Sequence, residues 1–305
     1  VSGGQAGSSP MIRNYPGFPH GVSGHDLAIR ACEQAWMFGA HLVYSQPAVG
    51  LDCCQAGEYA VILGGGERIA ARAIIIASGI AWRRLGVPRL EALVGAGVFY
   101  GAAGSDTRAM TGCDVYIVGA GNSAGQAALH LARHARQVTL LVRGDSLAHS
   151  MSAYLTREIE ATANLTVLLH TEITDGHGDE RLAALTLHDK LADRTWQVPA
   201  DALFVLIGGE PHTQWLPEAI QRERGYLLTG RDVVRTGSHP SRWPLDRAPL
   251  ALETSIPGVF AAGDTRYGSI KRVASAVGDG ATAVRLVHEY LATSPAEALP
   301  LPAGS

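Results

Sequence analysis

The sequence has few cysteines, no long apolar run and little net charge, and each of these shortages argues against a class of protein or partner. Four cysteines are spread over 305 residues and none of them forms a C-x-x-C pair, so the sequence indicates neither a disulfide framework nor a cysteine-based metal site. The longest apolar runs, such as residues 73–77, are far too short to cross a bilayer. The net charge of −3 gives no reason to expect nucleic acid or an anionic membrane as a partner. The cysteines are Cys32, Cys53, Cys54 and Cys113.

Targeting and metal-binding signals are missing as well. The first residues do not combine a basic start with an apolar stretch, so we predict no signal peptide and expect a cytoplasmic protein. The twelve histidines are scattered without the spacing of a metal-binding motif, so we nominate no metal ligand.

Length and composition indicate a globular protein of two domains. A chain of 305 residues exceeds the usual size of a single hydrophobic core. Apolar residues make up 47% and charged residues 17% of the chain, which is typical of globular proteins. The 36 glycines indicate many tight turns, or places where the backbone approaches a ligand closely.

One stretch, residues 113–143, has the pattern strand, tight turn, helix, strand. Its turn fits G-x-G-x-x-A, in which Gly119 allows the turn and Gly121 lets the backbone approach a pyrophosphate, while Ala124 lets the helix lie close to the strand. The start of the helix then offers N–H groups and a partial positive charge to phosphates. We therefore predict nucleotide binding here; the alternative is a turn that serves packing alone. The turn residues are Gly119, Ala120, Gly121, Asn122, Ser123 and Ala124.

The residue that ends the second strand of this stretch is Arg143. An acidic residue at this place favours NAD and an arginine favours NADP, because arginine can pair with the 2′-phosphate. Asp145 follows two residues later and weakens the preference. Only two lysines occur in the chain, so arginine is its usual cation and Arg143 could also be an ordinary solvated side chain. We expect NADPH and leave NADH open.

The remaining elements alternate between strands and helices. We expect a loop over residues 3–21, and we expect Tyr59–Leu63 and Glu67–Ala71 to form a hairpin and residues 173–198 an antiparallel meander. The other predicted strands are residues 41–45, 73–77, 165–169, 201–207 and 258–261, and the other predicted helices are residues 23–39, 150–161 and 271–291.

Five short motifs run in one order along nearly the whole chain. They are Gly3-Gly4-Gln5 with residues 12–15, Ala77-Ser78-Gly79, the Gly119 turn, Ile207-Gly208, and the long run Thr254–Asp264. With them the sequence resembles the low-molecular-weight thioredoxin reductases, and more closely their relatives that lack the redox disulfide. The resemblance implies an α/β fold with two Rossmann-like, doubly wound, three-layer nucleotide-binding domains. An NAD(P)H domain, residues 82–209, would be inserted in an FAD domain made of residues 1–81 and 210–305.

The resemblance also implies FAD and NADPH as cofactors, with NADH as the alternative to NADPH. Asp264 would accept hydrogen bonds from the ribityl chain of FAD, although an aspartate there could also be a helix or turn cap. A helix start near the flavin pyrimidine edge would stabilise the anion that develops on the reduced flavin. The implied FAD site comprises Gln5 and Asn14 on one side of the flavin, and Gly208, Gly263, Asp264, Lys271, Arg272 and Val273.

Three departures from the family pattern matter. Where the reductases carry C-x-x-C, this chain has Tyr100 followed by Gly101-Ala102-Ala103-Gly104, and glycine can form neither a thiolate nor a disulfide. The strand and glycine-rich turn that hold the ADP half of FAD have no counterpart, so we expect the chain to be a fragment whose FAD domain lacks a central strand. Gly144 and Ala148 stand where arginines would bind the 2′-phosphate, so dual use of NADPH and NADH is expected.

These inferences predict an FAD-dependent oxidoreductase that passes hydride from NAD(P)H to flavin and then to an external acceptor, without dithiol chemistry. We nominate no catalytic side chain, because the cofactor supplies the chemistry. The acceptor could be a quinone, oxygen, a ferredoxin-like protein or a dithiol protein, and the resemblance suggests a homodimer. The alternatives are a non-catalytic NAD(P)H-binding redox sensor, a fragment of a larger flavoprotein, or an inactive paralogue.

Overall fold

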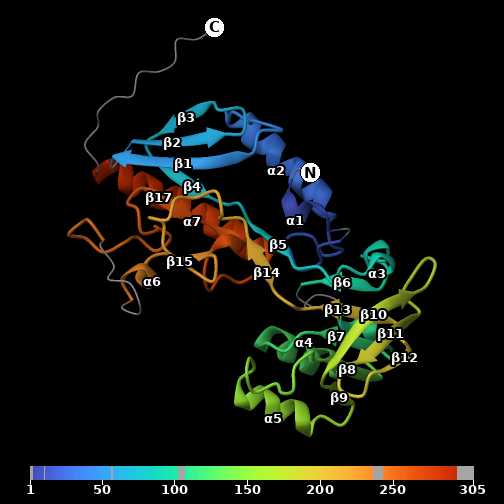
Figure 1. Ribbon diagram of the computed structural model, residues 1–305. Helices are drawn as coiled ribbons and strands as arrows, with labels where there is room; N and C mark the ends of the chain where they lie inside the picture. The colour runs from blue at the N-terminus through green and yellow to red at the C-terminus, as the bar shows by residue number, and fades with distance from the viewer. Residues whose placement is uncertain (1–2, 10, 56–57, 102–106, 236–242, 294–305) are drawn as a thin grey trace. The chain divides into compact units, whose positions relative to one another are not determined.

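The fold is described from a computed structural model, which describes residues 3–9, 11–55, 58–101, 107–235 and 243–293 (Figure 1). The chain divides into two compact units. Unit 1 comprises Val1–Gly7, Asp26–Ala81 and Pro211–Ser305, and unit 2 comprises Ser8–His25 and Trp82–Glu210. The chain passes between the units after Gly7 and after His25, and again within β5 (Ile80–Trp82) and β14 (Gly209–Pro211), which pair with each other.

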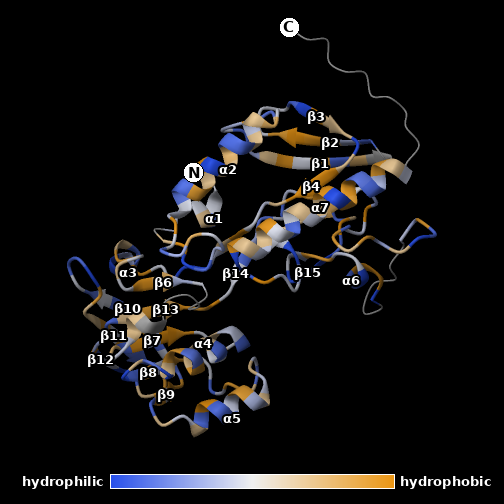
Figure 2. Cartoon of the chain, turned by 180° about the vertical axis from the view of Figure 1, so that it is seen from behind, coloured by the Kyte–Doolittle hydropathy of each residue, from blue (hydrophilic) through white to orange (hydrophobic). Residues whose placement is uncertain are grey.

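Unit 2 is built on a five-stranded sheet in the order β6-β13-β7-β8-β9, and its strand pairs are all parallel. The strands are short and mostly hydrophobic (Figure 2), as expected for parallel strands that are covered on both faces. The predicted strand–turn–helix–strand is confirmed as β7, α4 and β8. The strands are β6 (Val98–Tyr100), β7 (Asp114–Val118), β8 (Gln137–Leu141), β9 (Leu165–Leu168) and β13 (Ala202–Val205), and α4 is Asn122–Ala132.

Two different layers cover this sheet. On one face the apolar side chains of α4 and of α5 (Ala153–Ala161) pack against β7, β8 and β9. On the other face lie α3 (Pro88–Ala92) and the predicted antiparallel meander, confirmed in the order β10-β11-β12. Unit 2 is therefore a three-layer α/β domain with a Rossmann-like core. The meander strands are β10 (Thr171–His177), β11 (Ala184–Asp189) and β12 (Arg194–Pro199), and a short 3-10 helix, η1, spans Thr107–Met110.

Unit 1 also has three layers, around a parallel pair of strands, β4 (Ile74–Ile76) and β17 (Val259–Ala261). Ile74 and Ile76 share a core with the antiparallel sheet β1-β2-β3, whereas Phe260 packs on the other side with α7 (Val273–Thr293). Among the described residues no third strand joins β4 and β17. The antiparallel sheet contains β1 (Ala48–Gln55), β2 (Glu58–Leu63) and β3 (Arg68–Ala71); smaller elements are β15 (Arg222–Glu223), β16 (Tyr226–Leu227), α6 (Arg231–Val234) and η2 (Gly263–Thr265).

Two sequence predictions in the first part of the chain were wrong. Residues 41–45 are not a strand; the strand that follows the first long helix is β1, from Ala48. Residues 3–21 are not wholly a loop, because α1 spans Gly4–Gly7 and Ile12 forms an isolated bridge with Val22.

The predicted helix after Ser23 is confirmed as α2, Gly24–Met37, but its apolar face is not buried. Trp36 is 72% and Phe38 81% exposed. A hollow of about 740 Å³ lies between the helix and the segment after it, lined by residues that include Cys32, Trp36 and Tyr44.

Cys32 in α2 and Cys113 just before β7 are both half-buried. Neither is therefore the fully buried core residue that a cysteine often is.

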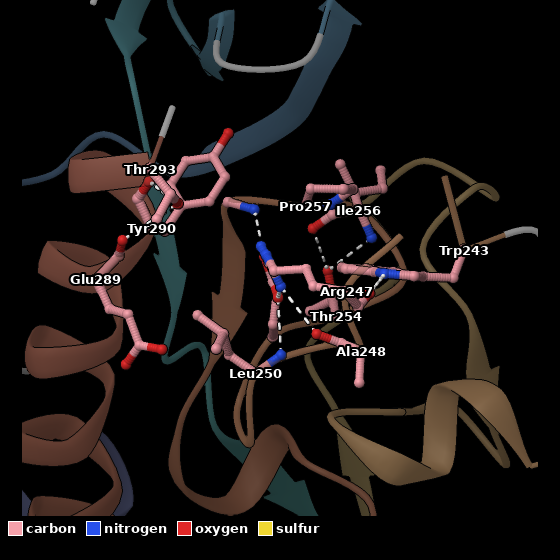
Figure 3. A network of polar contacts seen from close by, with 12 residues as sticks. Trp243, Arg247, Ala248, Leu250, Thr254, Ile256, Pro257, Glu289, Tyr290 and Thr293 are labelled. Carbon is pink, nitrogen blue, oxygen red and sulfur yellow. Dashed lines mark hydrogen bonds and ion pairs between the residues drawn. The ribbon is translucent and has the colours of Figure 1, made fainter. Parts of the chain in front are cut away.

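A buried carboxylate organises the segment that leads into β17. Glu253 is fully buried, and its two oxygens accept Arg247 Nη2 and Nη1 at 2.8 and 2.7 Å. They also accept the backbone N–H of Gly258 and of Leu250, each at 2.9 Å. Figure 3 shows Arg247 within this network, close to Trp243. With four donors the buried charge is satisfied, which is the condition for burying one without a large penalty.

Within the described ranges, no helix combines the length and the apolar character needed to cross a bilayer.

Candidate functional site

The turn between β7 and α4 in unit 2 can be made only with glycine at position 119. Gly119 has φ 149°, and a Cβ placed there would lie 2.5 Å from the carbonyl oxygen of Leu206 and 3.0 Å from Ala124 Cβ. Leu206 is fixed in turn, because its N–H donates to the carbonyl of Val118 at 2.8 Å. The backbone of the neighbouring strand thus leaves no room for a side chain at this turn.

The start of α4 is open on the side that a nucleotide would approach. Gly121 precedes the helix in an extended conformation, and a Cβ at Gly121 would meet no atom closer than 4.0 Å. Ala124 is fully buried, in agreement with its predicted role of letting the helix lie close to the strand. Ser123 is exposed at the first turn.

Asn122 has a structural role that the sequence did not indicate. Its Oδ1 accepts the backbone N–H of Ser152 at 2.8 Å and the Ser152 hydroxyl at 3.1 Å. Ser150 Oγ in addition donates to the carbonyl of Ala120 at 2.8 Å. These hydrogen bonds hold the segment before α5 against the glycine turn. Sequence reasoning missed both serines because they lie about 30 residues away from the turn along the chain.

Arg143 lies two residues after the end of β8 and is exposed. Nearby, His149 Nδ1 lies 3.5 Å from Asp145 Oδ1, and both side chains are largely exposed. At Gly144 an added Cβ would meet no atom within 4 Å. The segment that follows β8 therefore offers Arg143 to a 2′-phosphate. At Gly144 it also has room for a second arginine, which the sequence lacks.

Asp264 in unit 1 lies in η2, the 3-10 turn that follows β17. Its Oδ1 is buried and has no hydrogen-bond partner among the described residues. Burial raises the pKa of Asp264, and the charge of Lys271 opposes that shift. A buried acceptor without a donor is costly, so the site suits a ligand that brings hydroxyl groups to this oxygen.

Lys271 is brought to the same place. Its Nζ donates to the carbonyl of Asp264 at 2.7 Å and to Ser269 Oγ at 2.6 Å, and it lies 4.5 Å from the centroid of the Tyr226 ring. Burial lowers the pKa of this ammonium group. The carbonyl of Arg272 accepts the N–H of Ala276 at 3.0 Å, and Val273 begins α7. Asp264 and residues 271–273 therefore form one cluster around the start of α7.

The other predicted flavin residues are spread over both units. Gln5 is exposed in α1 of unit 1, and Asn14 is exposed in unit 2. Gly208 also belongs to unit 2; it has φ 91°, and its carbonyl accepts the N–H of Arg83 at 3.1 Å. The structure therefore gathers the Asp264 cluster within one unit and the Gly119 turn within the other.

Two charged residues of unit 1 were missed by sequence reasoning. Arg266 follows Asp264 by two residues, and Asp279 lies in α7; Arg266 Nε donates to Asp279 Oδ2 at 3.0 Å. The available signal was an aspartate between Gly278 and Gly280 on a mostly apolar helix.

The residues that stand in place of the C-x-x-C of the reductases fall partly outside the described part of the chain. Gly104 is not described, but Gly101 is buried with φ 87°. A Cβ at Gly101 would lie 2.7 Å from Trp82 Cζ2. Just before it, the hydroxyl of Tyr100 donates to Glu91 and accepts the N–H of Leu85, and burial together with Glu91 raises the pKa of Tyr100 to about 12.

Comparisons with known proteins identify the family of the chain. The family model described as pyridine nucleotide-disulphide oxidoreductase matches residues 3–280. The thioredoxin reductase of Bacillus subtilis is 31% identical over 296 residues, which cover 95% of this chain and 84% of the relative. That of Mycolicibacterium smegmatis is 32% identical over 293 residues, covering 95% and 86%.

Solved structures give the same result. The crystal structure of thioredoxin reductase from Streptococcus pyogenes has a TM-score of 0.80 at 26% identity and covers 96% of this chain and 88% of its own. Thioredoxin reductase from Giardia duodenalis also has a TM-score of 0.80 at 26% identity, covering 95% and 87%. The chain therefore belongs to the pyridine nucleotide-disulphide oxidoreductase family and is thioredoxin reductase-like.

Proposed function

We propose that this chain is an FAD-dependent oxidoreductase that passes hydride from NAD(P)H to flavin and then electrons to an external acceptor, without a dithiol of its own. Unit 1 would hold FAD and unit 2 the nicotinamide nucleotide, close to the predicted domains 1–81 with 210–305 and 82–209. The observation that carries the proposal is the buried Oδ1 of Asp264, which lacks a donor among the described residues.

The residues around Asp264 fit a flavin nucleotide. Ribityl hydroxyls can donate to a buried carboxylate oxygen, and hydrogen bonds to a charged group are among the stronger ones in proteins. The start of α7 adds the partial positive charge of a helix N-terminus, and Lys271 adds a half-buried ammonium group. When bound, the flavin supplies hydride and electron transfer, and these residues supply position and electrostatics.

The glycine turn of unit 2 fits a dinucleotide. Gly119 is required by the backbone of Leu206, Gly121 leaves the helix start open, and the peptide groups there can receive a pyrophosphate. Arg143 is the residue of this chain that would bind a 2′-phosphate, with Gly144 and Ala148 beside it. We therefore propose NADPH as the preferred donor and NADH as a second one.

The absence of dithiol chemistry is supported at Gly101. Glycine carries no sulfur, and Trp82 lies where a side chain at this position would be. A single cysteine restored at residue 101 would thus meet an aromatic ring in a strained backbone conformation.

Gly101→Cys is expected to destabilise the protein by roughly 1–3 kcal/mol, because it combines a φ of 87° with overpacking against Trp82. Thermal unfolding followed by circular dichroism measures the loss. Gly95→Cys is the matched control, since Gly95 has φ 86° and no atom within 4 Å of an added Cβ. Equal stability of the two variants would contradict the packing argument, and thioredoxin reduction by the unmodified chain would contradict the disulfide-free proposal.

The function itself is tested by a visible spectrum of the purified chain after FAD addition and desalting, followed by anaerobic NADPH or NADH. We expect retained flavin that bleaches with both nucleotides, faster with NADPH. Turnover with ferricyanide or a quinone would then exclude a sensor that binds without reacting. Loss of flavin while nucleotide still binds would favour the sensor or fragment alternatives, and loss of both affinities an inactive paralogue.

The partners of the reaction are proposed more coarsely. NAD(P)H is the donor, and the acceptor is a small molecule such as a quinone or oxygen, or a redox protein of the ferredoxin or dithiol type. The homodimer and the cytoplasmic location stay predictions from the sequence. Size-exclusion chromatography with light scattering tests the first of these.

A further inference from the structure

A forked ion pair connects the turn that carries Asp264 to the long helix α7. Arg266 donates from Nε to Oδ2 of Asp279 at 3.0 Å and from Nη2 to Oδ1 at 3.2 Å. The two side chains are only 17% and 21% exposed. A two-pronged contact of this kind fixes orientation as well as distance.

Asp279 also holds the backbone on the other side of Asp264. Its Oδ2 accepts the N–H of Gly263 at 3.0 Å. Gly263 has φ 72°, and a Cβ there would lie 3.2 Å from Ala276 Cβ, so α7 and the turn approach each other closely. The residue before Asp264 and the second residue after it are therefore both attached to one carboxylate.

Arg266 extends the connection to a third segment. Its Nη1 donates to Oγ1 of the buried Thr229 at 3.2 Å, and its backbone N–H donates to the carbonyl of Gly263 at 3.1 Å. Asp264 itself takes no part in these contacts, and its Oδ1 remains without a donor among the described residues. The network thus places the carboxylate of Asp264 without occupying that oxygen.

We propose that Arg266 and Asp279 are positioning residues for the flavin: they hold the Asp264 carboxylate beside the start of α7, where ribityl hydroxyls can reach it. This inference rests on the proposed function and assigns a role to two residues beyond it. Neither residue needs to contact the flavin.

The test is a titration of the full chain, freed of flavin, with FAD. Asp279→Asn is expected to raise the dissociation constant of FAD about ten- to a hundredfold, because an amide nitrogen would face the donors of Arg266 and the turn would lose its anchor. Flavin that still binds should show a visible spectrum closer to that of free FAD. Arg266→Lys retains one charged contact and is expected to raise the dissociation constant of FAD measurably, but by less than about tenfold. NADPH affinity, which depends on unit 2, should not change.

Asp232→Asn is the matched control, since Asp232 pairs with the exposed Arg235 at 3.1 Å in the same unit. A folded Asp279→Asn protein that binds FAD as the unmodified chain does would overturn the inference. If Asp279→Asn does not fold, Arg266→Lys decides in the same way, with unchanged FAD affinity against it. If the unmodified chain binds no FAD, the proposed function fails, and this inference fails with it.

Discussion

Gly119→Ala is expected to weaken NADPH binding by more than about a hundredfold and to destabilise unit 2 by roughly 2–5 kcal/mol. The added Cβ would lie 2.5 Å from the carbonyl oxygen of Leu206, and the backbone φ is 149°. Leu206 cannot move away without breaking its 2.8 Å hydrogen bond to Val118 in the sheet. The backbone of the turn must therefore shift away from Leu206. The N–H groups at the start of α4 then no longer point together toward a bound pyrophosphate. Isothermal titration with NADPH and thermal unfolding measure the two effects.

Gly112→Ala separates conformational strain from the steric clash. Gly112 also has a positive φ, 76°, but an added Cβ there would meet no atom within 4 Å. We expect this variant to bind NADPH normally and to lose about 1 kcal/mol of stability. If both variants lose nucleotide affinity to the same degree, the role assigned to the Leu206 backbone is wrong.

Glu253→Gln is expected to destabilise the protein by roughly 3–5 kcal/mol, the usual cost of breaking one partner out of a buried ion pair. The carboxylate of Glu253 is fully buried and accepts four donors, two from Arg247 and two from the backbone. A glutamine would turn an N–H group toward two of them and leave the Arg247 charge without its partner. Since Gly258 N–H is one of the four, the segment that enters β17 should loosen first.

Urea unfolding followed by circular dichroism tests this expectation. Asp232→Asn again serves as the control, because an exposed pair contributes about 0–1 kcal/mol. A loss below about 1 kcal/mol for Glu253→Gln would contradict the assignment of the network as a main support of unit 1.

The elements that the sequence predicted correctly are those with a strong local pattern. The run from β7 through α4 to β8 combines continuous apolar strands with a glycine turn, and both are properties of neighbouring residues. Residues 41–45 have a similar apolar character, but a strand also needs a partner. Among the described residues no strand pairs with this segment, and β4 pairs with β17 instead.

The missed strand β1 shows the opposite case. Gly50 and Asp52 interrupt its alternation, and its pairing with β2 is irregular at two places. The segment still forms a strand because it pairs with β2, which is itself paired with β3 on its other side. Its existence therefore depends on a tertiary contact rather than on its own sequence.

The same distinction applies to the candidate site. Gly119, Ala124 and Asp264 belong to compact motifs and could be named in advance. The contacts Asn122 to Ser152, Trp82 to Gly101, and Arg266 to Asp279 join residues that are 13 to 30 positions apart. No local spacing rule identifies such pairs, because they depend on which segments the fold brings together.

The parallel pair of β4 and β17 has a consequence for how the chain is made. The five strands of the unit 2 sheet have all been synthesised once Val205 has left the ribosome, whereas β4, which ends at Ile76, must wait for β17, which begins at Val259. Because domains fold as units and pairing over a long chain separation is slow, we expect unit 2 to be folded first. The isoleucines of β4 would remain exposed on the nascent chain throughout that interval.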